Sequence, residues 1–506
     1  MVNYKKLQNG SDVRGIAAEG IQDEHINLTP QASYYIARAF AKWLADKKGV
    51  STDALTIGIG HDSRITADIL CEAAVAGMAG VGVTVKTCDL VSTPSMFMTT
   101  VMDGFKFDGS IMVTASHLPF NRNGLKFFDV NGGLEHDDIT EVLQIAESLD
   151  NGSYTEDAMK KEVKAESVDS ISAYCDYMKK KIRDGVGADD FEHPLTGLHI
   201  VVDAGNGAAG FFVEKILKPL GADVSGSQFL EPDGMFPNHI PNPENKQAME
   251  AIRSAVLANK ADLGVIFDTD VDRMSAVLPD GTEVNRDAII AMMAAILAKE
   301  YPGGTIVTDS VTSDRLTAFL EGELGMKHHR YMRGYKNVIN ESIRLNQEGI
   351  LSPLAIETSG HGALSENYFL DDGAYMAVKI LIALALAKKE GKQLASYIEK
   401  LAPGVEEREY RFKIEGEDFG AYGKEVLVQF EERAKAKGYY VVPDSYEGIR
   451  LRFEGEVGGW VLLRLSLHDP QMPLNIEGLK VGDCDKLYAI VLELLEGFDR
   501  LVKPVK

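Results

Sequence analysis

Three stretches of the chain repeat one pattern: LTIGIGHDSR at 55–64, LHIVVDAGNG at 198–207 and GTIVTDSVTS at 304–313. In each stretch an apolar, β-branched run ends at an Asp and leads into a turn of small residues and a helical pattern. A Gly then opens a second strand or loop 16 to 18 residues after the Asp, about the length of one crossover helix with its turns. The repeat predicts three similar mixed α/β domains built on βαβ cores, with largely parallel and buried strands.

The 506-residue chain is too long for a single hydrophobic core. The polar segment 148–168 is typical of a helical or loose connection, and KEYPGGT near residue 300 breaks the chain again. From about residue 403, the strands GIRLRFEG and GGWVLLRLSL and the amphipathic run KLYAIVLELLEGFDRLV (486–502) predict a smaller antiparallel α+β domain. We expect four domains around a central cleft: 1–165, 166–298, 299–402 and 403–506.

The charge of the chain limits its partners. A formal net charge of −23 argues against nucleic acid and against an anionic membrane, so a site for an anionic ligand must be built locally from a few cations and N–H groups. The four cysteines show no CxxC or zinc spacing, which is typical of a reducing compartment. The sequence begins without an apolar signal-like region and has no apolar run of about 20 residues. We therefore expect a cytoplasmic protein.

The stretch ADLGVIFDTDVDRM (261–274) carries the strongest local signal for chemistry. Asp268, Asp270 and Asp272 alternate after a buried-looking strand, so their carboxylates converge and repel one another. A hard divalent cation with oxygen ligands, most simply Mg²⁺, relieves that repulsion. An EF-hand is excluded because Arg273 and Pro279 stand where its Gly and Glu belong. A solvated acidic turn is the plainer alternative.

Five weaker patterns complete the set of candidates. VTASHLPFNRNGLKFF (113–128) displays Ser116, His117 and Lys126, a reactive centre or an ordinary surface turn. In LAIETSGH, the alternating Glu357, Ser359 and His361 suit hydroxyls of a sugar-like ligand. In RLSLHDP, the residues Arg464, Ser466 and His468 share one strand face and suit a phosphate, or form an exposed edge. SDVRG and MRGYK add basic and aromatic loop residues that taken singly fit surface positions: Arg14, Arg333, Tyr335 and Lys336.

Taken together in chain order, these motifs resemble the α-D-phosphohexomutase superfamily, typified by phosphomannomutase and phosphoglucomutase. TASHLPFNRNGLKFF is similar to the phosphoserine loop of that family, with Leu118 in place of the usual Asn. DTDVDR resembles its metal loop, with Thr269 in place of Gly, and ETSGH, GYK and SDVRG resemble its sugar, third-domain and first Arg motifs. The phosphate loop departs most, because Leu467 and His468 replace Gly-Thr and Asp469 replaces Glu.

The resemblance implies an isomerase that interconverts a hexose 1-phosphate and a hexose 6-phosphate, of mannose or glucose or both. Ser116 would carry the phosphoryl group, and a hexose 1,6-bisphosphate would be both intermediate and activator. One Mg²⁺ per active site would be bound by Asp268, Asp270 and Asp272 and bridged to the phosphate on Ser116. Lys126, or else His117, would transfer the proton. The remaining implied roles are phosphate charge stabilisation by Arg14 and Arg273, and substrate binding by Glu357, Ser359, His361, Tyr335, Lys336, Arg464, Ser466 and His468. Monomer and homodimer both stay open.

Three alternatives remain at this point. VIFDTDV also resembles the opening motif of haloacid-dehalogenase-type sugar phosphatases, with Asp268 as nucleophile and Asp270 as acid/base, but this leaves Ser116 and the repeats unexplained. A phosphoglucosamine mutase is the second alternative, although the ETSGH form of the sugar loop and the overall length favour mannose or glucose. A non-catalytic sugar-phosphate-binding protein on the same scaffold is the third alternative, although the nucleophile and all three metal ligands are present.

Overall fold

The computed structural model describes residues 2–152, 154–155, 165–466 and 469–504. The chain divides into two compact units, which are described one at a time. Unit 1 comprises Met1–Ile296 and Ser359–Tyr397, and unit 2 comprises Leu297–Thr358 and Ile398–Lys506. Over the described ranges, no helix has both the length and the apolar character needed to cross a membrane.

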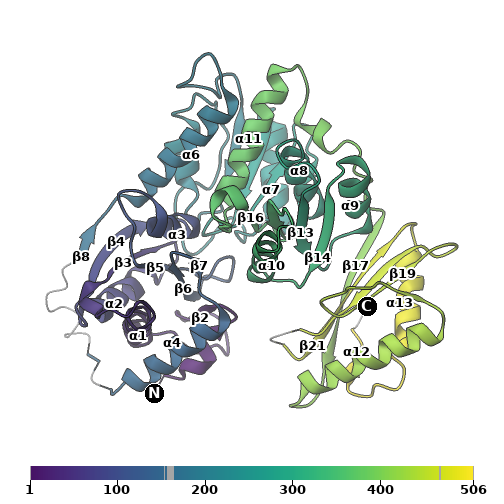
Figure 1. Cartoon of the computed structure of the whole chain (residues 1–506), viewed down its shortest axis with the longest axis horizontal. Coiled ribbons are helices and arrows are strands. Elements are labelled where there is room, and N and C mark those ends of the chain that lie inside the picture. The colour runs from purple at the N-terminus through teal and green to yellow at the C-terminus, as the bar shows by residue number, and fades with distance from the viewer. Residues whose placement is uncertain (1, 153, 156–164, 467–468, 505–506) are drawn as a thin grey trace. The chain divides into compact units, whose positions relative to one another are not determined.

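The first sheet of unit 1 carries the first repeat, and its strands other than β1 are labelled in Figure 1. Strand β3 pairs in parallel with β4 and β5, and β6 pairs with β5 and β2 in an antiparallel sense. In sheet order the strands are β1 (Gln8–Asn9), β2 (Asp12–Ile16), β6 (Arg122–Asp129), β5 (Gly109–Val113), β3 (Thr56–His61), β4 (Thr84–Leu90) and β8 (Ala165–Ser167), with β7 (Gly132–Gly133) beside β6. The helices are α1 (Pro30–Lys48), α2 (Ala67–Ala79), α3 (Thr93–Val101) and α4 (His136–Leu149).

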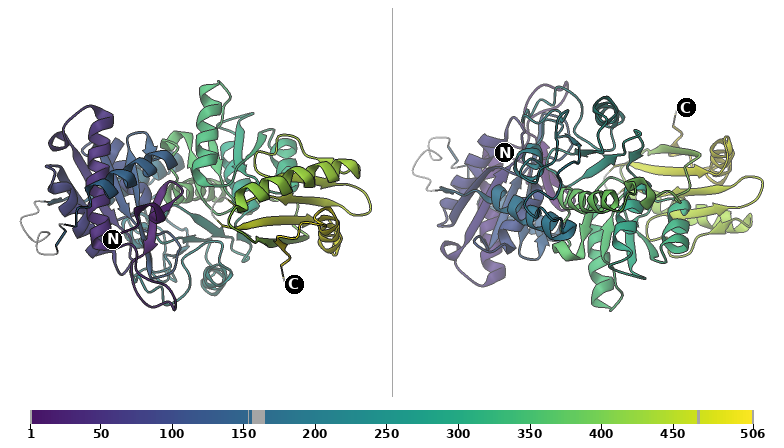
Figure 2. Two further views of the ribbon diagram at one scale, coloured as in Figure 1. Left: turned by 90° about the horizontal axis from the view of Figure 1, so that it is seen from below. Right: turned by 90° about the horizontal axis from the view of Figure 1, so that it is seen from above.

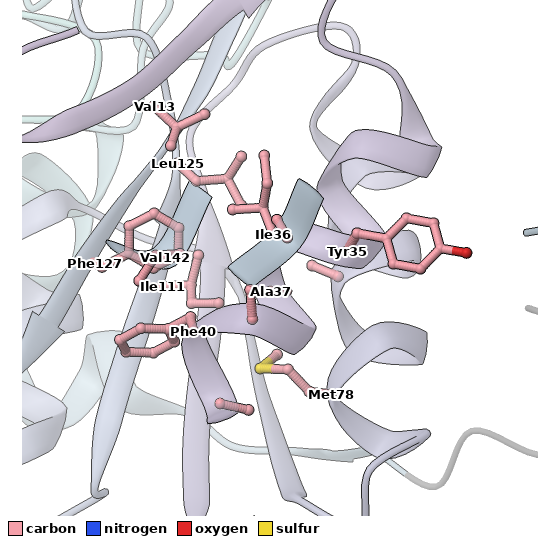
Figure 3. Packing of buried hydrophobic residues seen from close by; sticks show 14 of the residues in the cluster. Val13, Tyr35, Ile36, Ala37, Phe40, Met78, Ile111, Leu125, Phe127 and Val142 are labelled. Atoms are coloured by element: carbon pink, nitrogen blue, oxygen red, sulfur yellow. The ribbon is translucent and has the colours of Figure 1, made fainter. Parts of the chain in front are cut away.

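Helices α1, α2 and α4 share one hydrophobic core with this sheet (Figure 3). Phe40 of α1 packs against Phe127 of β6 with ring centroids 4.9 Å apart, and Met78 and Val142 join the same cluster. Helix α1 begins where Thr29 caps the N–H of Ala32, with Pro30 in its first turn, and ends at Gly49 in the left-handed conformation. The predicted strand–helix–strand order of this repeat is confirmed.

The second sheet of unit 1 has the order β12-β11-β10-β9, with β9 and β10 parallel and β11 antiparallel to β10. Helix α11 packs beside α6 and β11 (Figure 1). The elements are α6 (Ser170–Val186), β9 (Ile200–Asp203), α7 (Lys246–Asn259), β10 (Leu263–Phe267), β11 (Met274–Val277), β12 (Glu283–Val284), α8 (Asp287–Leu297) and α11 (Gly373–Lys389). The short strand β16 (Gly362–Leu364) precedes α11 in the chain and is not part of this sheet.

The second repeat is less regular than the sequence predicts. Its crossover is a short π-helical turn over Phe212–Leu217, and the returning segment makes isolated parallel bridges, Asp223 to His199 and Gln228 to Asp203, instead of a strand. Pro219 prevents the helix from continuing, and the positive φ values of Gly221 and Gly226 interrupt an extended ladder.

Unit 2 contains the third repeat and the C-terminal sheet. Strand β13 (Thr305–Asp309) pairs in parallel with β14 (Lys327–Tyr331) and β15 (Leu354–Ile356), as predicted, and α10 spans Tyr335–Gln347. Between β13 and β14 lie α9 (Asp314–Ala318) and a π-helical turn (Phe319–Glu323). The C-terminal sheet is antiparallel, and α12 runs alongside it (Figure 2). Its strands, in sheet order, are β18 (Tyr440–Val441), β19 (Ile449–Phe453), β20 (Gly459–Leu463), β21 (Gln471–Gly478), β17 (Glu406–Ile414) and β22 (Leu501–Val502).

Helices α12 (Phe419–Ala436) and α13 (Asp483–Leu494) cover the core of this sheet. The predicted helical run 486–502 is wrong at its end, because α13 stops at Leu494 and Leu501–Val502 pairs with β17. Gly497, at φ +83°, provides the turn between them. Much of the predicted connection 148–168 lies outside the described residues, and its last part, Ala165–Ser167, is an edge strand.

Candidate active site

The serine loop lies between β5 and β6 in unit 1, and an arginine binds its backbone. Ser116 is 1% exposed and adopts φ +50°, a left-handed conformation that a non-glycine residue adopts only when its surroundings hold it there. Arg64 donates to four carbonyl oxygens of the loop, those of Ser116, Leu118, Pro119 and Arg122. The contact with Leu118 is made by its backbone oxygen, so the hydrogen bond from Arg64 does not depend on the Leu118 side chain.

The predicted metal loop follows β10 directly, and its three acids converge. Asp268, Asp270 and Asp272 are buried, and ligand atoms of all three lie within 4.8 Å of one another. The Ser116 hydroxyl donates to Asp268 Oδ2 at 3.0 Å. Lys126 Nζ, on β6, donates to Asp270 Oδ2 at 2.9 Å and Asp272 Oδ2 at 2.5 Å. The structure therefore places the serine, the acids and the lysine in one buried cluster.

The acid cluster fits a hard divalent cation. Among the described residues, Asp270 Oδ1 and Asp272 Oδ1 are buried without a hydrogen-bond partner. Burial, together with the charges of Asp272 and Asp270, raises the pKa of Asp268 well above its usual value. Burial also acts to raise the pKa of Asp272, but Lys126, His361 and Arg273 outweigh it and hold that pKa below its usual range. Carboxylate oxygens with free lone pairs are the donors that Mg²⁺ prefers.

His117 lies next to the serine, and the charges of Arg273 and Arg14 act on it. His117 Nδ1 is 3.3 Å from Ser116 Oγ, and burial, followed by the charges of Arg273 and Arg14, lowers the pKa of His117 to about 2. The imidazole is therefore neutral at physiological pH. Arg14 lies on β2 opposite Gly124, and the backbone N–H of Arg273 donates to Asp268 Oδ1 at 3.2 Å.

His361 lies against the metal loop. Its Nδ1 atom is 2.5 Å from Asp371 Oδ2 and 3.8 Å from Asp272 Oδ1, and a bridge joins its backbone to that of Arg273. The imidazole thus neighbours a predicted metal ligand, whereas the sequence suggested only contact with a sugar. Ser359, two residues earlier, is buried.

Glycines allow other segments to press against the metal loop. A Cβ on Gly207 would lie 2.6 Å from the carbonyl oxygen of Thr269, and one on Gly373 would lie 2.7 Å from that of Arg273. Val271 adopts φ +68°, which is strained for a β-branched residue. The Thr93 hydroxyl donates to Asp270 Oδ2 at 2.5 Å, and this hydrogen bond connects the metal loop to the start of α3.

The remaining predicted residues belong to unit 2. Glu357 Oε1 accepts the N–H of Gly334 at 2.6 Å, and Tyr335 and Lys336 begin helix α10, half-buried. Arg464 follows β20, is 8% exposed, and donates through Nη1 to Glu447 Oε1 at 3.3 Å. Ser466 Oγ accepts the N–H of Asp469 at 3.2 Å. His468, and Leu467 before it, lie outside the described residues.

Comparison with known proteins identifies the family. Models described as phosphoglucomutase/phosphomannomutase, alpha/beta/alpha domains I, II and III, match residues 5–153, 172–281 and 285–403. The chain belongs to the phosphoglucomutase/phosphomannomutase family. It is a phosphohexomutase, an isomerase of hexose phosphates.

Individual relatives of this phosphohexomutase carry different substrate names. A phosphoglucomutase of Neisseria gonorrhoeae is 28% identical over 496 residues, which cover 98% of this chain and 97% of that protein. A phosphoglucosamine mutase of Alkaliphilus oremlandii (strain OhILAs) is 28% identical over 494 residues, covering 97% and 99%. The crystal structure of a phosphoglucomutase/phosphomannomutase family protein from Burkholderia thailandensis shares the fold, with a TM-score of 0.79, 23% identity and 100% coverage of both chains. The family assignment gives no support to the haloacid-dehalogenase alternative, whereas phosphoglucosamine stays open as a substrate.

Several residues of this phosphohexomutase site were missed from the sequence. Arg64 is the last residue of the quoted stretch LTIGIGHDSR. Its position just beyond the carboxyl end of a parallel strand could have indicated a place in the site. Asp371 stands in a DDG turn before a helix, and Thr93 is at a helix start, so each has a structural explanation by itself. Glu447 has no local pattern to distinguish it from other acids of this chain.

Proposed function

We propose that this phosphohexomutase interconverts a hexose 1-phosphate and a hexose 6-phosphate through a phosphoryl group carried on Ser116, with a hexose 1,6-bisphosphate as intermediate and activator. The observation that carries the proposal is the hydrogen bond of Ser116 Oγ to Asp268, beside two acids that keep unpartnered oxygens. A buried serine surrounded by acids is an unfavourable place for a phosphate unless cations offset the charge. Lys126, Arg14 and Arg273 supply part of that charge.

Asp268, Asp270 and Asp272 would hold one Mg²⁺, which when bound neutralises charge on the phosphoryl oxygens. Residues of the chain would transfer the proton and hold the serine loop in place. Lys126, which donates to Asp270 and Asp272, would deliver a proton to Ser116 Oγ when the phosphoryl group leaves. Arg64 holds the loop backbone, so that Ser116 keeps one orientation throughout. His117, neutral in its buried position, can accept a hydrogen bond but carries no charge to the site.

We assign substrate recognition to the residues of the sugar, third-domain and phosphate motifs. Glu357 and Ser359 would bind the ring hydroxyls, with His361 beside the metal ligands, and Arg464 and Ser466 would bind the phosphate that does not react. Tyr335 and Lys336 stand at the N-terminus of α10, where the helix dipole favours an anion. We further propose a reducing, cytoplasmic compartment, which the four free cysteines support.

The test is a coupled assay on the 1-phosphates of mannose, glucose and glucosamine, each primed with its 1,6-bisphosphate. We expect turnover of at least one of them and, after priming, an intact mass that carries one phosphoryl group. Ser116→Ala should abolish both. The matched control, Ser148→Ala, removes an exposed hydroxyl that bonds only to its own helix, and it should behave as wild type.

Other outcomes would contradict the proposal. Activity retained by Ser116→Ala would rule out the phosphoserine, and release of inorganic phosphate without isomerisation would indicate a phosphatase. Unchanged binding of sugar phosphate with no turnover in wild type would indicate a binding protein. Preference for glucosamine 1-phosphate would leave the mechanism intact and change the substrate.

A further inference from the structure

Glu447 lies in the connection between β18 and β19, and its carboxylate accepts hydrogen bonds from a set of donors that would suit a phosphate. Its Oε2 atom accepts the Ser310 hydroxyl at 2.5 Å and the backbone N–H of Arg333 at 3.0 Å. Its Oε1 atom accepts Arg464 Nη1 at 3.3 Å. A hydroxyl, a peptide N–H and a guanidinium are the groups with which proteins commonly hold a phosphate. Here a carboxylate of the chain itself uses them.

The next residue, Gly448, allows the backbone to bring Glu447 close to Arg464. Gly448 has φ +72°, and a Cβ there would lie 2.2 Å from the carbonyl oxygen of Leu463 and 2.7 Å from Arg464 Cα. Only glycine allows the connection to approach the end of β20 so closely. The Glu447 and Arg464 side chains are 13% and 9% exposed, so the pair is largely shielded from water.

The charges around Arg464 show what the pair does. Burial lowers the pKa of Arg464, the Glu447 carboxylate opposes that shift, and Arg333 reinforces it. Glu447 therefore stabilises the guanidinium before any ligand arrives. Within the described part of the chain, Arg464 Nε has no hydrogen-bond partner, so the guanidinium keeps a donor for a second anion. A phosphate that binds to the Arg464 guanidinium is repelled by the nearby negative charge of the Glu447 carboxylate.

We propose that Glu447 is a specificity-determining residue that weakens the hold of Arg464 on the substrate phosphate. This inference rests on the proposed function, in which the two phosphates of the bisphosphate exchange places during each turnover. A phosphate bound too tightly at Arg464 would lower KM but slow that exchange, since uniform binding does not raise kcat. The internal carboxylate keeps the phosphate contact strong enough to orient the substrate and weak enough to release it.

Glu447→Gln tests the inference because it removes the charge and keeps an oxygen that can accept from Ser310 and Arg333. We expect Kd for glucose 6-phosphate, measured by calorimetry, and KM to fall about tenfold, with a lower kcat. Glucose, which has no phosphate, should show no change in binding. The matched control is Glu348→Gln, which removes a carboxylate paired with Arg344 at 2.6 Å elsewhere in unit 2 and should leave Kd, KM and kcat at wild-type values.

The direction of the effect separates tuning from a structural role. If Glu447 only supported the fold, its loss would weaken phosphate binding, so an unchanged or higher Kd overturns the inference. In an Arg464→Gln background, Glu447→Gln should no longer change Kd, and an equal effect in both backgrounds would also overturn it. If Glu447→Gln does not fold, Glu447→Ala, which also removes the charge, is judged by the same criterion.

Failure of the proposed function gives a different result. In that case the wild-type enzyme would show no isomerisation, whatever Glu447→Gln does to the calorimetric Kd. The binding measurement thus tests the Glu447–Arg464 pair separately from turnover.

Discussion

At the scale of single residues, the site is organised by buried charges whose partners lie far away in the sequence. Arg64 is the clearest case, because its side chain is fully buried and its guanidinium serves four loop carbonyls and lies 3.5 Å from Asp62. Burial lowers the pKa of Arg64, and Asp62 opposes that shift. A buried charge is stabilising only while all of its partners are present. The conformation of Ser116 therefore depends on Arg64.

We predict that Arg64→Met lowers both stability and activity. Loss of the guanidinium leaves four carbonyls without their donor and the buried Asp62 carboxylate without its neighbouring cation, so the free energy of unfolding should fall by about 3 kcal/mol or more. The released loop should also misplace Ser116, at a cost of about 100-fold in kcat. Urea unfolding and the coupled assay measure the two effects.

The control for this prediction is Arg253→Met, which removes a half-exposed arginine paired with Glu250 in the same unit. It should change neither quantity appreciably. If Arg64→Met loses stability but its folded fraction keeps wild-type kcat, Arg64 supports the fold without positioning the serine.

At the scale of elements, helix α11 carries an unusual cap. Asp372 caps its N-terminus by accepting the N–H of Tyr375 at 2.8 Å, and it also accepts the Tyr174 hydroxyl at 2.7 Å and the Asn367 amide at 3.0 Å. Despite these three donors, burial raises the pKa of Asp372 to about 7. The helix therefore starts at a carboxyl group that titrates in the physiological range.

The raised pKa of Asp372 predicts a loss of stability with rising pH. In the unfolded chain this carboxyl loses its proton near pH 4, whereas in the folded protein it keeps the proton up to about pH 7. Its contribution to stability is complete below pH 4 and is lost as the pH rises to 7. Between pH 5 and 7.5, wild type should lose about 3 kcal/mol more than Asp372→Asn.

Urea unfolding of both proteins at the two pH values measures this difference, because the other titrating groups are common to both. Asn keeps an acceptor for the Tyr375 N–H, so the variant retains the cap. Parallel pH profiles for the two proteins would show that Asp372 does not titrate in this range.

At the scale of the whole molecule, the parts predicted from sequence are those encoded by neighbouring residues. The βαβ repeats with regular crossovers and the convergence of Asp268, Asp270 and Asp272 follow from local periodicity. The second repeat departs because Pro219 and two glycines act against the pattern. Contacts such as those of Arg64 or Glu447 join residues brought close only by folding, so no spacing in the sequence reveals them.

Each compact unit also contains one of the two tryptophans of the chain, Trp43 in unit 1 and Trp460 in unit 2. Trp43 stacks on Phe40 in the hydrophobic core of the first sheet. The Arg450 guanidinium carbon lies 3.7 Å from the centroid of the Trp460 ring. All three proposed Mg²⁺ ligands lie in unit 1. A ligand that binds only the folded form stabilises the unit that binds it.

We therefore predict that Mg²⁺ shifts the unfolding of one unit more than that of the other. In Trp460→Phe, the fluorescence of Trp43 reports unit 1, and Mg²⁺ at 100 times its Kd should add about 2.7 kcal/mol to its stability. In Trp43→Phe, the signal of Trp460 should shift much less. Chelation of Mg²⁺ should reverse the first shift, and Asp270→Asn should abolish it. Equal shifts of both signals would show that the two units unfold as one cooperative body, and the absence of any shift would contradict the metal site.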